Sequence, residues 1–164
     1  MKVIIHDLGA EYTALFEQKA DSVIHADGRY APCQGCFGCW TKHPMQCMMK
    51  DKLQYASRLL AQADEMTIVT KNCYGSYSPA VKNVLDRAIS STTPLSWFRG
   101  GDMHHVLRKG GGGTLLRVIV YGSMTQQERD TFTLMAQRNA HNDGFARAEV
   151  VFAGENPQWK ELIA

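Results

Sequence analysis

The segment EMTIVTKNCYGSYSPAVKNVLDR, from Glu65 to Arg87, carries the clearest structural signal in the sequence. It opens with the run Glu65 to Val69, which is typical of a short buried strand. A polar loop follows, and Ser78-Pro79 then supplies a helix cap and a first-turn proline. Apolar residues at helical spacing indicate the helix: Val81, Val84, Leu85, Ala88 and Ile89. Strand, loop and helix in this order form the unit of a parallel α/β sheet.

Four further apolar runs extend this pattern along the chain. The expected strands are Val3 to Ile5, Ser22 to Ala26, Leu115 to Tyr121 and Ala148 to Phe152. Helices are expected between them, from Asp51 to about Gln62 and, after a capping box at Thr125, to about Asn142. Such alternation predicts a parallel α/β sheet with right-handed crossovers and helices on both faces. Residues 1–164 are expected to form a single domain.

The composition excludes several classes of function. The chain is 45% hydrophobic and has a net charge of +2, with its basic residues scattered. Such a core needs neither disulfides nor a metal to fold, and a nucleic-acid-binding surface would need clustered basic residues. No run reaches the ~20 apolar residues of a membrane span, and the first residues are too short an apolar run for a signal peptide. We therefore expect a cytoplasmic protein with no nucleic-acid or membrane partner.

Four of the five cysteines lie in one stretch, CQGCFGCWTKHPMQC. In a reducing compartment such spacing favours metal binding or redox use over structural disulfides. Two-residue spacings let three thiolates converge on one cubane, and a more distant fourth closes it. The candidate metal ligands, for a 4Fe-4S cluster, are Cys33, Cys36, Cys39 and Cys47. The cysteine loop, residues 32–50, is also compatible with zinc, or with packed or redox-active thiols.

Residues 90–113 form the longest stretch without a clear period. They contain Trp97-Phe98, Gly100-Gly101 and a run of four glycines from Gly110. We interpret them as an irregular excursion, because long connections in compact domains are usually functional flaps or disordered segments. The two aromatic residues are suited to covering a cofactor or a dimer partner.

Two stretches of the chain resemble the flavodoxin-like family that includes NAD(P)H-dependent FMN reductases and iron–sulfur flavoproteins. One is Cys33 to Cys47, with Asp51 shortly after it, and the other is Thr70 to Arg87. The resemblance implies a flavodoxin-like three-layer sandwich with a five-stranded parallel sheet in the order 2-1-3-4-5. It also implies FMN at the strand ends, NAD(P)H as a substrate, and assembly as a homodimer or homotetramer.

By this resemblance, the loop after the third strand runs along the flavin ring and the end of the fourth strand borders the ring or the nicotinamide. The implied cofactor-binding residues are Thr70, Lys71, Asn72, Cys73, Tyr74, Gly75, Ser76, Ser78, Tyr121, Gly122 and Ser123. Loops at this edge of a parallel sheet usually carry the ligand. The alternative interpretation is an ordinary strand-to-helix turn at each position.

The loop after the first strand departs from the family pattern. Family members have a Ser/Thr- and Asn-rich phosphate loop there, whereas this chain has DLGAEYTA, from Asp7 to Ala14. Asp7 and Glu11 put negative charge where the FMN phosphate is expected, and Thr13 is the only Ser or Thr of the loop. Either the flavin is held differently or this chain has lost it.

The leading hypothesis is an FMN-dependent NAD(P)H oxidoreductase that passes hydride from a nicotinamide to a flavin and onward to a quinone, a free flavin or an iron–sulfur partner. We identify no catalytic side chain, because the cofactor carries this chemistry. One alternative is an iron–sulfur electron-transfer flavoprotein. The other is a flavodoxin-like domain that has lost its cofactor and serves in binding or thiol sensing.

Overall fold

Five parallel strands form the central sheet of the protein, as seen in a computed structural model that describes residues 1–108 and 112–162. The strands are β1 (Lys2–His6), β2 (Ser22–His25), β3 (Glu65–Lys71), β6 (Leu115–Tyr121) and β7 (Arg147–Gly154). Their order, β2-β1-β3-β6-β7, is the predicted 2-1-3-4-5 once only the strands of this sheet are counted. The fold class and strand order were therefore predicted correctly.

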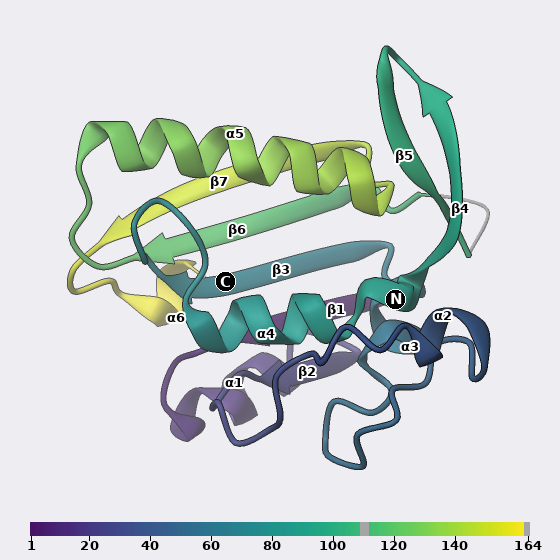
Figure 1. The fold of residues 1–164 in the computed structure, drawn as a ribbon. Coiled ribbons are helices and arrows are strands. Elements are labelled where there is room, and N and C mark those ends of the chain that lie inside the picture. The colour runs from purple at the N-terminus through teal and green to yellow at the C-terminus, as the bar shows by residue number, and fades with distance from the viewer. Residues whose placement is uncertain (109–111, 163–164) are drawn as a thin grey trace.

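Helices cover both faces of the sheet and complete a three-layer arrangement (Figure 1). One face packs against α3 (Ala56–Ala61), α4 (Pro79–Arg87) and α5 (Gln126–Asp143). The other packs against the short elements η1 (Ala10–Tyr12), α1 (Thr13–Glu17) and α6 (Trp159–Leu162). No helix within the described ranges is long and apolar enough to cross a membrane.

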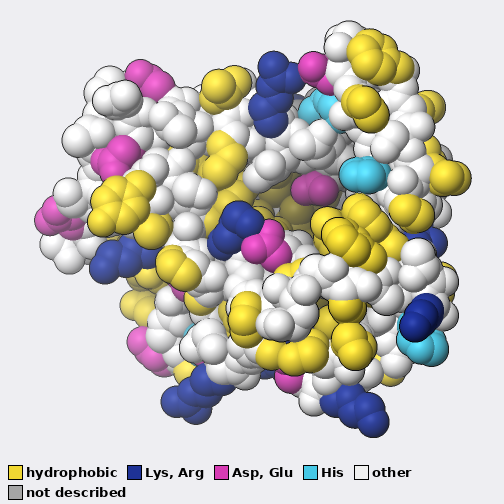
Figure 2. Space-filling model, in the orientation of Figure 1, with side chains coloured by type: hydrophobic (Ala, Val, Ile, Leu, Met, Phe, Trp, Pro, Cys, Tyr) yellow, Lys and Arg dark blue, Asp and Glu magenta, His cyan; other side chains and the backbone are white. Residues whose placement is uncertain are grey.

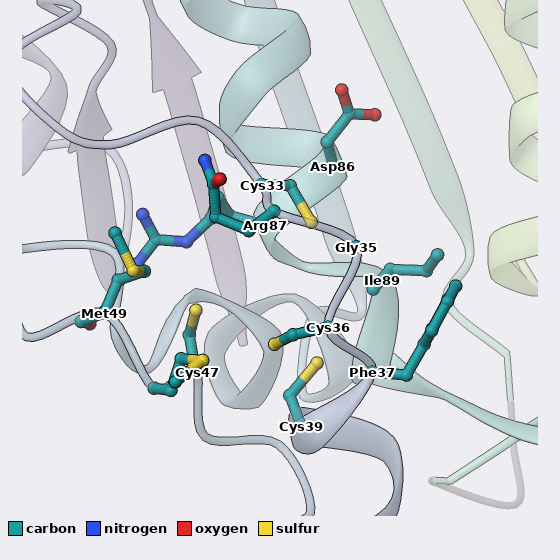
Figure 3. A pocket seen from close by; sticks show the side chains of 12 residues that line it. Cys33, Gly35, Cys36, Phe37, Cys39, Cys47, Met49, Asp86, Arg87 and Ile89 are labelled. Carbon is teal, nitrogen blue, oxygen red and sulfur yellow. The ribbon is translucent and has the colours of Figure 1, made fainter.

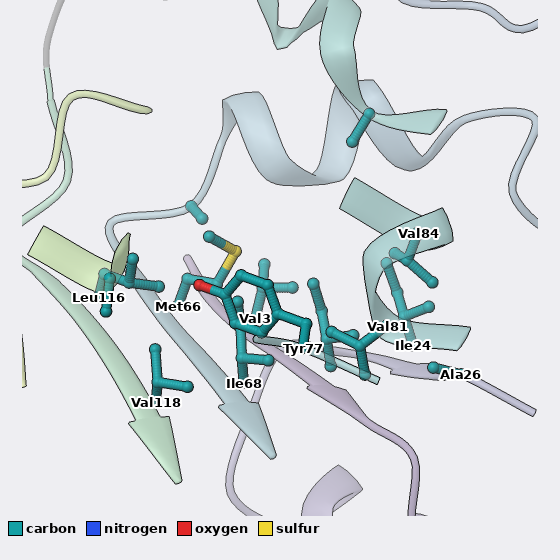
Figure 4. Close-up of a cluster of buried hydrophobic side chains, with 14 of the residues drawn as sticks. Val3, Ile24, Ala26, Met66, Ile68, Tyr77, Val81, Val84, Leu116 and Val118 are labelled. Carbon is teal, nitrogen blue, oxygen red and sulfur yellow. The ribbon is translucent and has the colours of Figure 1, made fainter. Parts of the chain in front are cut away.

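The strands are apolar on both sides because both sides are buried. In β3, Met66 and Ile68 join the larger core cluster, whereas Val69 joins the smaller one on the opposite face. Figure 4 shows the larger cluster, in which Val81 and Val84 of α4 pack toward the strand residues. The helical spacing that predicted α4 thus marks the residues that hold it against the sheet.

The predicted helix boundaries are largely confirmed. The Ser78 hydroxyl accepts a hydrogen bond from the Val81 amide at 3.4 Å, and Pro79 occupies the first turn of α4. Thr125 and Glu128 form the predicted capping box of α5, and Gly144 ends that helix in a left-handed conformation with φ 79°. The prediction of a helix from Asp51 was too long, because α3 begins only at Ala56.

The prediction of an irregular excursion at residues 90–113 was wrong for most of its length. After η2 (Ile89–Ser91), the strands β4 (Thr92–Arg99) and β5 (Asp102–Leu107) form an antiparallel hairpin. Figure 1 shows this hairpin projecting beyond the body of the sheet. Gly100 and Gly101 both have positive φ, the conformation that a two-residue hairpin turn requires. Residues 109–111 of the predicted excursion lie outside the described residues.

Candidate functional site

The carboxyl ends of three neighbouring strands bring the predicted flavin loops together. In the sheet register, His6 of β1 pairs with Val69 of β3, and Lys71 of β3 pairs with Tyr121 of β6. Below, this side of the sheet is called the carboxyl edge, and the side where the strands begin is called the amino edge. Ligands of open α/β sheets usually bind at the carboxyl edge.

After β3 the chain makes a tight hairpin that presents an aromatic ring. The Cys73 and Ser76 backbones exchange two hydrogen bonds of 3.0 Å each. Between them, Tyr74 and Gly75 both have positive φ, 55° and 76°, and the Tyr74 side chain is 92% exposed. A tyrosine in this conformation is uncommon and indicates that the surroundings impose it.

Asn72 fixes this hairpin to the neighbouring loop. Its side chain accepts a hydrogen bond from the Gly75 amide and donates one to the Ser123 carbonyl, both at 3.0 Å. Gly75 lies so close to α5 that an added Cβ would be 3.2 Å from the backbone of Glu128. The structure therefore joins the predicted residues Asn72 to Ser76 and Ser123 in one local assembly.

Other predicted residues at this edge have their polar groups committed to the protein itself. Thr70 is fully buried, and its hydroxyl accepts a 2.9 Å hydrogen bond from the amide of Ser78, which is also buried. The Lys71 amide donates to the Asp7 carboxylate at 3.0 Å. Thr70 and Ser78 thus hold the start of α4 and have no group free for a ligand in this arrangement.

Tyr121 and Gly122 are also turned toward the protein. The Tyr121 ring packs edge-on against Trp159 of α6, with 5.2 Å between ring centroids, and Trp159 also contacts Tyr12. Burial, and then the charge of nearby Asp7, raise the pKa of Tyr121. The Gly122 amide donates to the Gly154 carbonyl at 2.8 Å. These aromatic rings fill the space beside the end of β6.

The phosphate of FMN does not fit the loop after β1. The Glu11 carboxylate folds over Gly9, where it would collide with any added Cβ. One oxygen of Asp7 binds the Lys71 amide, and its other oxygen, Oδ1, is buried without a hydrogen-bond partner. The Thr13 hydroxyl is already hydrogen-bonded to His6 at 3.2 Å. A phosphate there would meet two carboxylates, and the one Thr hydroxyl of the loop is already engaged, so this position is electrostatically costly for an anion.

The two histidines behind this loop are structural. His6 is fully buried and stacks on His25 with 4.8 Å between ring centroids. Burial, together with His25 and Lys52, lowers the pKa of His6 to about 4. His6 is therefore neutral at physiological pH.

The cysteine loop leaves the carboxyl edge and follows α4 to the amino edge. The Tyr30 hydroxyl binds the carbonyl of Ala80 in the first turn of α4, and the Cys33 amide binds the Asn83 side chain in its middle. The Trp40 indole then donates to the Ile89 carbonyl, just beyond the end of α4, at 3.2 Å. The chain in front of α4 in Figure 1 shows this path. The cysteines therefore lie away from the flavin loops, in the same chain.

Four cysteines, all free thiols, surround one largely apolar cavity of about 250 Å³. Its lining residues include Cys33, Cys36, Phe37, Cys39, Cys47, Met48, Met49, Arg87 and Ile89. Figure 3 shows Cys33 beside Asp86, on the far side of the cavity from Cys47. Three residues of the loop have a left-handed backbone, with φ 61° at Gly35, 55° at Phe37 and 61° at Met45.

Arg87 anchors the floor of this cavity, a role that the sequence analysis missed. It is 2% exposed, and its guanidinium forms a two-pronged ion pair with Asp51 at 2.8 and 2.9 Å. It also donates to the carbonyls of Ala31 and Met49. Burial alone lowers the pKa of Arg87, but the bonds to Asp51 and the interaction with Cys47 outweigh it and raise the pKa. Arg87 follows Val84 by three residues, so helical spacing alone could have placed Arg87 on the apolar face of α4.

The described residues do not support the predicted metal site. Among them, no three His, Cys, Asp or Glu side chains are grouped closely enough to hold a metal ion. A four-iron cluster needs all four thiolates around one centre, and here the thiols line the wall of a cavity instead. Cys73 lies in the hairpin after β3, away from this cavity.

Comparisons with known proteins support the fold and leave the family open. No family model and no curated protein matches the sequence. The structure is similar to an FMN-dependent NADH-azoreductase from Bacillus anthracis in complex with FMN, with a TM-score of 0.55 and 12% identity over 93% of this chain and 86% of the neighbour. It is also similar to FerB, a flavoenzyme NAD(P)H:(acceptor) oxidoreductase from Paracoccus denitrificans, with a TM-score of 0.50 and 12% identity over 92% and 74% of the two chains. Both are described as flavin enzymes, and at this identity the likeness establishes a similar fold alone.

Proposed function

We propose that the chain is an NAD(P)H-dependent flavin oxidoreductase that binds flavin by its ring, as an exchangeable substrate. One observation carries the proposal: the hairpin from Asn72 to Ser76 presents the exposed ring of Tyr74 at the carboxyl edge, in a conformation that the surroundings impose. Aromatic side chains stack on flat ligands with a gain of roughly 0.5–1.5 kcal/mol. The two structural neighbours, described as FMN-dependent and as acting with NAD(P)H, support the class of reaction.

The loop after β1 supports a substrate over a resident FMN. A resident FMN gains much of its affinity from phosphate contacts at a helix N-terminus, and Asp7 and Glu11 occupy that position here. A flavin held by its ring alone exchanges readily. The hydride transfer belongs to the two bound substrates, and the protein orients them. The acceptor after the flavin is a quinone or a second flavin.

The experiment compares FMN with riboflavin, which lacks the phosphate. Fluorescence titration should show that FMN binds no more tightly than riboflavin, and both should be reduced by NADH or NADPH in the presence of the protein. Tyr74→Ala should weaken binding of both by roughly 3- to 10-fold, the equivalent of one lost stacking contact. Tyr55→Ala is the matched control, since Tyr55 is an exposed tyrosine just before α3, away from this hairpin.

The double variant Asp7→Ser, Glu11→Asn tests the account of the phosphate position. It should raise the affinity for FMN and leave that for riboflavin unchanged. An equal change for both flavins would show that the loop does not face the phosphate. A protein that binds neither flavin at millimolar concentration contradicts the proposed function.

The four thiols around one cavity favour a second candidate function, thiol sensing. In this reaction two thiols of the cysteine loop and one hydrogen peroxide give one disulfide and two waters. Mass spectrometry after peroxide treatment should locate the disulfide between residues 33 and 47, and Cys73→Ser should leave its yield unchanged. Oxidation that stops at sulfinic acid, with no disulfide, argues against this candidate.

The projecting hairpin supports assembly as a homodimer or homotetramer. Its large apolar side chains are exposed: Leu95, Trp97, Phe98 and Met103. Exposed aromatic residues gathered on one element usually mark a protein interface. Sedimentation should give a dimer or tetramer for the native protein and a monomer for Trp97→Ser, Phe98→Ser. A native monomer would leave the hairpin without this role.

A further inference from the structure

A second cavity, of about 440 Å³, lies at the amino edge between α4, α5 and the β4–β5 hairpin. Its volume is within the range of small-molecule sites, roughly 300–1,000 Å³. Figure 2 shows a hollow at the foot of the hairpin, with an acidic and a histidine side chain at its margin. Nothing in the proposed flavin chemistry uses this cavity, although Tyr77 and Met135 of its wall adjoin Ser76 of the Asn72–Ser76 hairpin.

The charge of this cavity comes mainly from Asp143. Asp143 is the last residue of α5, where the helix dipole disfavours an anion. Within the described ranges, no Lys, Arg or His side chain forms an ion pair with it. Asp143 lines the cavity and is reached by solvent. The surrounding protein still removes part of the water from its carboxyl group, and this desolvation raises the pKa to about 6. Both features leave a carboxylate that a cationic ligand would stabilise.

The other polar groups of the cavity add hydrogen-bond acceptors. His104 shares a 2.7 Å hydrogen bond between its Nδ1 and the Asn142 side-chain oxygen, so Nδ1 is the donor and Nε2 is the acceptor in the neutral ring. That Nε2 atom is buried without a partner. Lys82 also lines the cavity, and its ammonium group is paired with Asp86 one turn along α4. The free groups therefore suit a ligand that is positively charged and donates hydrogen bonds.

The remaining wall is apolar. Leu85 and Ile89 contribute from the end of α4, Met103 from the hairpin and Met135 from α5. Methionine side chains are flexible and polarizable, and they adapt to aromatic ligands. We propose that this cavity binds a small organic amine, with its ammonium group on Asp143 and its apolar body between Met103 and Met135.

The test uses 2-phenylethylamine and its neutral analogue 2-phenylethanol, followed by titration calorimetry or ligand-observed NMR on the full chain. At pH 7.5 the amine should bind at least roughly 10-fold more tightly than the alcohol, which is the effect expected of one charge-assisted hydrogen bond. Asp143→Asn should remove this preference and keep the weak binding of the alcohol. Asp130→Asn, an exposed acid on the same helix, should bind the amine as the native protein does.

The pH dependence provides an independent readout. Amine binding should weaken as the pH falls through about 6, because Asp143 takes up a proton there. The other titratable or charged groups that face this acid from the packed elements are Tyr77, Lys82, Asp86, His104 and His105. Asp143→Asn should lose the part of the pH dependence that is due to this acid. Equal affinities for amine and alcohol, no binding of either, or native amine binding by Asp143→Asn would each overturn the proposal.

Discussion

The carboxyl and amino edges of the same sheet differ in the space that they enclose. At the carboxyl edge, Asp7, Thr70 and Asn72 bond to neighbouring loops, and aromatic rings fill the space beside β6. At the amino edge, two cavities open beside α4, although both edges contain buried side-chain atoms without a hydrogen-bond partner. The general rule places ligands at the carboxyl edge. Here that edge offers an exposed surface for a ring, whereas the enclosed volume lies at the opposite edge.

The distance between the edges matters for electron transfer. β3 has seven residues, which at about 3.3 Å each separate its two ends by roughly 20 Å. A redox group in the cysteine loop would therefore lie far from a flavin ring at Tyr74 of the same chain. The two candidate sites are best tested as independent sites.

The largest loss of stability is expected from Arg87→Met, which tests whether the cysteine loop at the amino edge depends on one ion pair. The substitution leaves Asp51 without its partner and frees the carbonyls of Ala31 and Met49. Breaking a buried pair in this way costs about 3–5 kcal/mol of unfolding free energy. Urea denaturation measures this loss. Arg138→Met removes an exposed pair with Asp102 and should change stability by less than about 1 kcal/mol.

The next effect concerns the buried His6 at the carboxyl edge. The pKa of His6 is lowered to about 4 in the folded protein, below the ordinary value of about 6.5. Between these values the unfolded chain binds a proton that the folded chain does not, so stability falls as the pH drops from about 6.5 to 4. Relative to His6→Gln, the native protein should lose about 2 kcal/mol over this range.

A smaller loss of stability is expected from two Gly→Ala substitutions, one at each edge, at glycines that both have a left-handed backbone. Gly75 has φ +76° and would clash with the Glu128 backbone if it gained a Cβ, whereas Gly35 has φ +61° and open space around it. Gly35→Ala should cost about 1 kcal/mol for the backbone alone. Gly75→Ala should cost about 2 kcal/mol, because α5 must also shift. Thermal unfolding of the two variants measures the difference, and equal losses would show that the hairpin can move.

The smallest effect is expected at the start of α5, which follows the carboxyl-edge loop of β6. Thr125→Ala removes the hydroxyl that accepts the Glu128 amide at 3.2 Å. Loss of such a cap costs about 1 kcal/mol. Thr133→Ala is the control within the same helix, since that hydroxyl only binds the carbonyl one turn back. If both variants lose the same stability, the cap contributes nothing of its own.

Local signals were enough to predict most of the fold. The β-branched runs gave the sheet strands, and Ser78, Thr125 and Gly144 gave helix ends, because capping depends on residues only a few positions apart. The hairpin at β4 and β5 was missed although Gly100-Gly101 was visible. Its strands lack a clear alternation because the hairpin packs little of its surface on the core.

By itself, the sequence determined the five sheet strands, the position of the Tyr74 loop and the acidic character of the loop after β1, while the strand order came from the family resemblance. Only the tertiary structure decided which groups remain free for a ligand. Asp51 was expected at the start of a helix and instead pairs with Arg87, and Asp143, at the end of α5, lines a cavity beside His104. These partners are separated by more than thirty residues along the chain. Periodicity and capping report on neighbours a few residues apart, whereas pairing and enclosure depend on segments that only folding brings together.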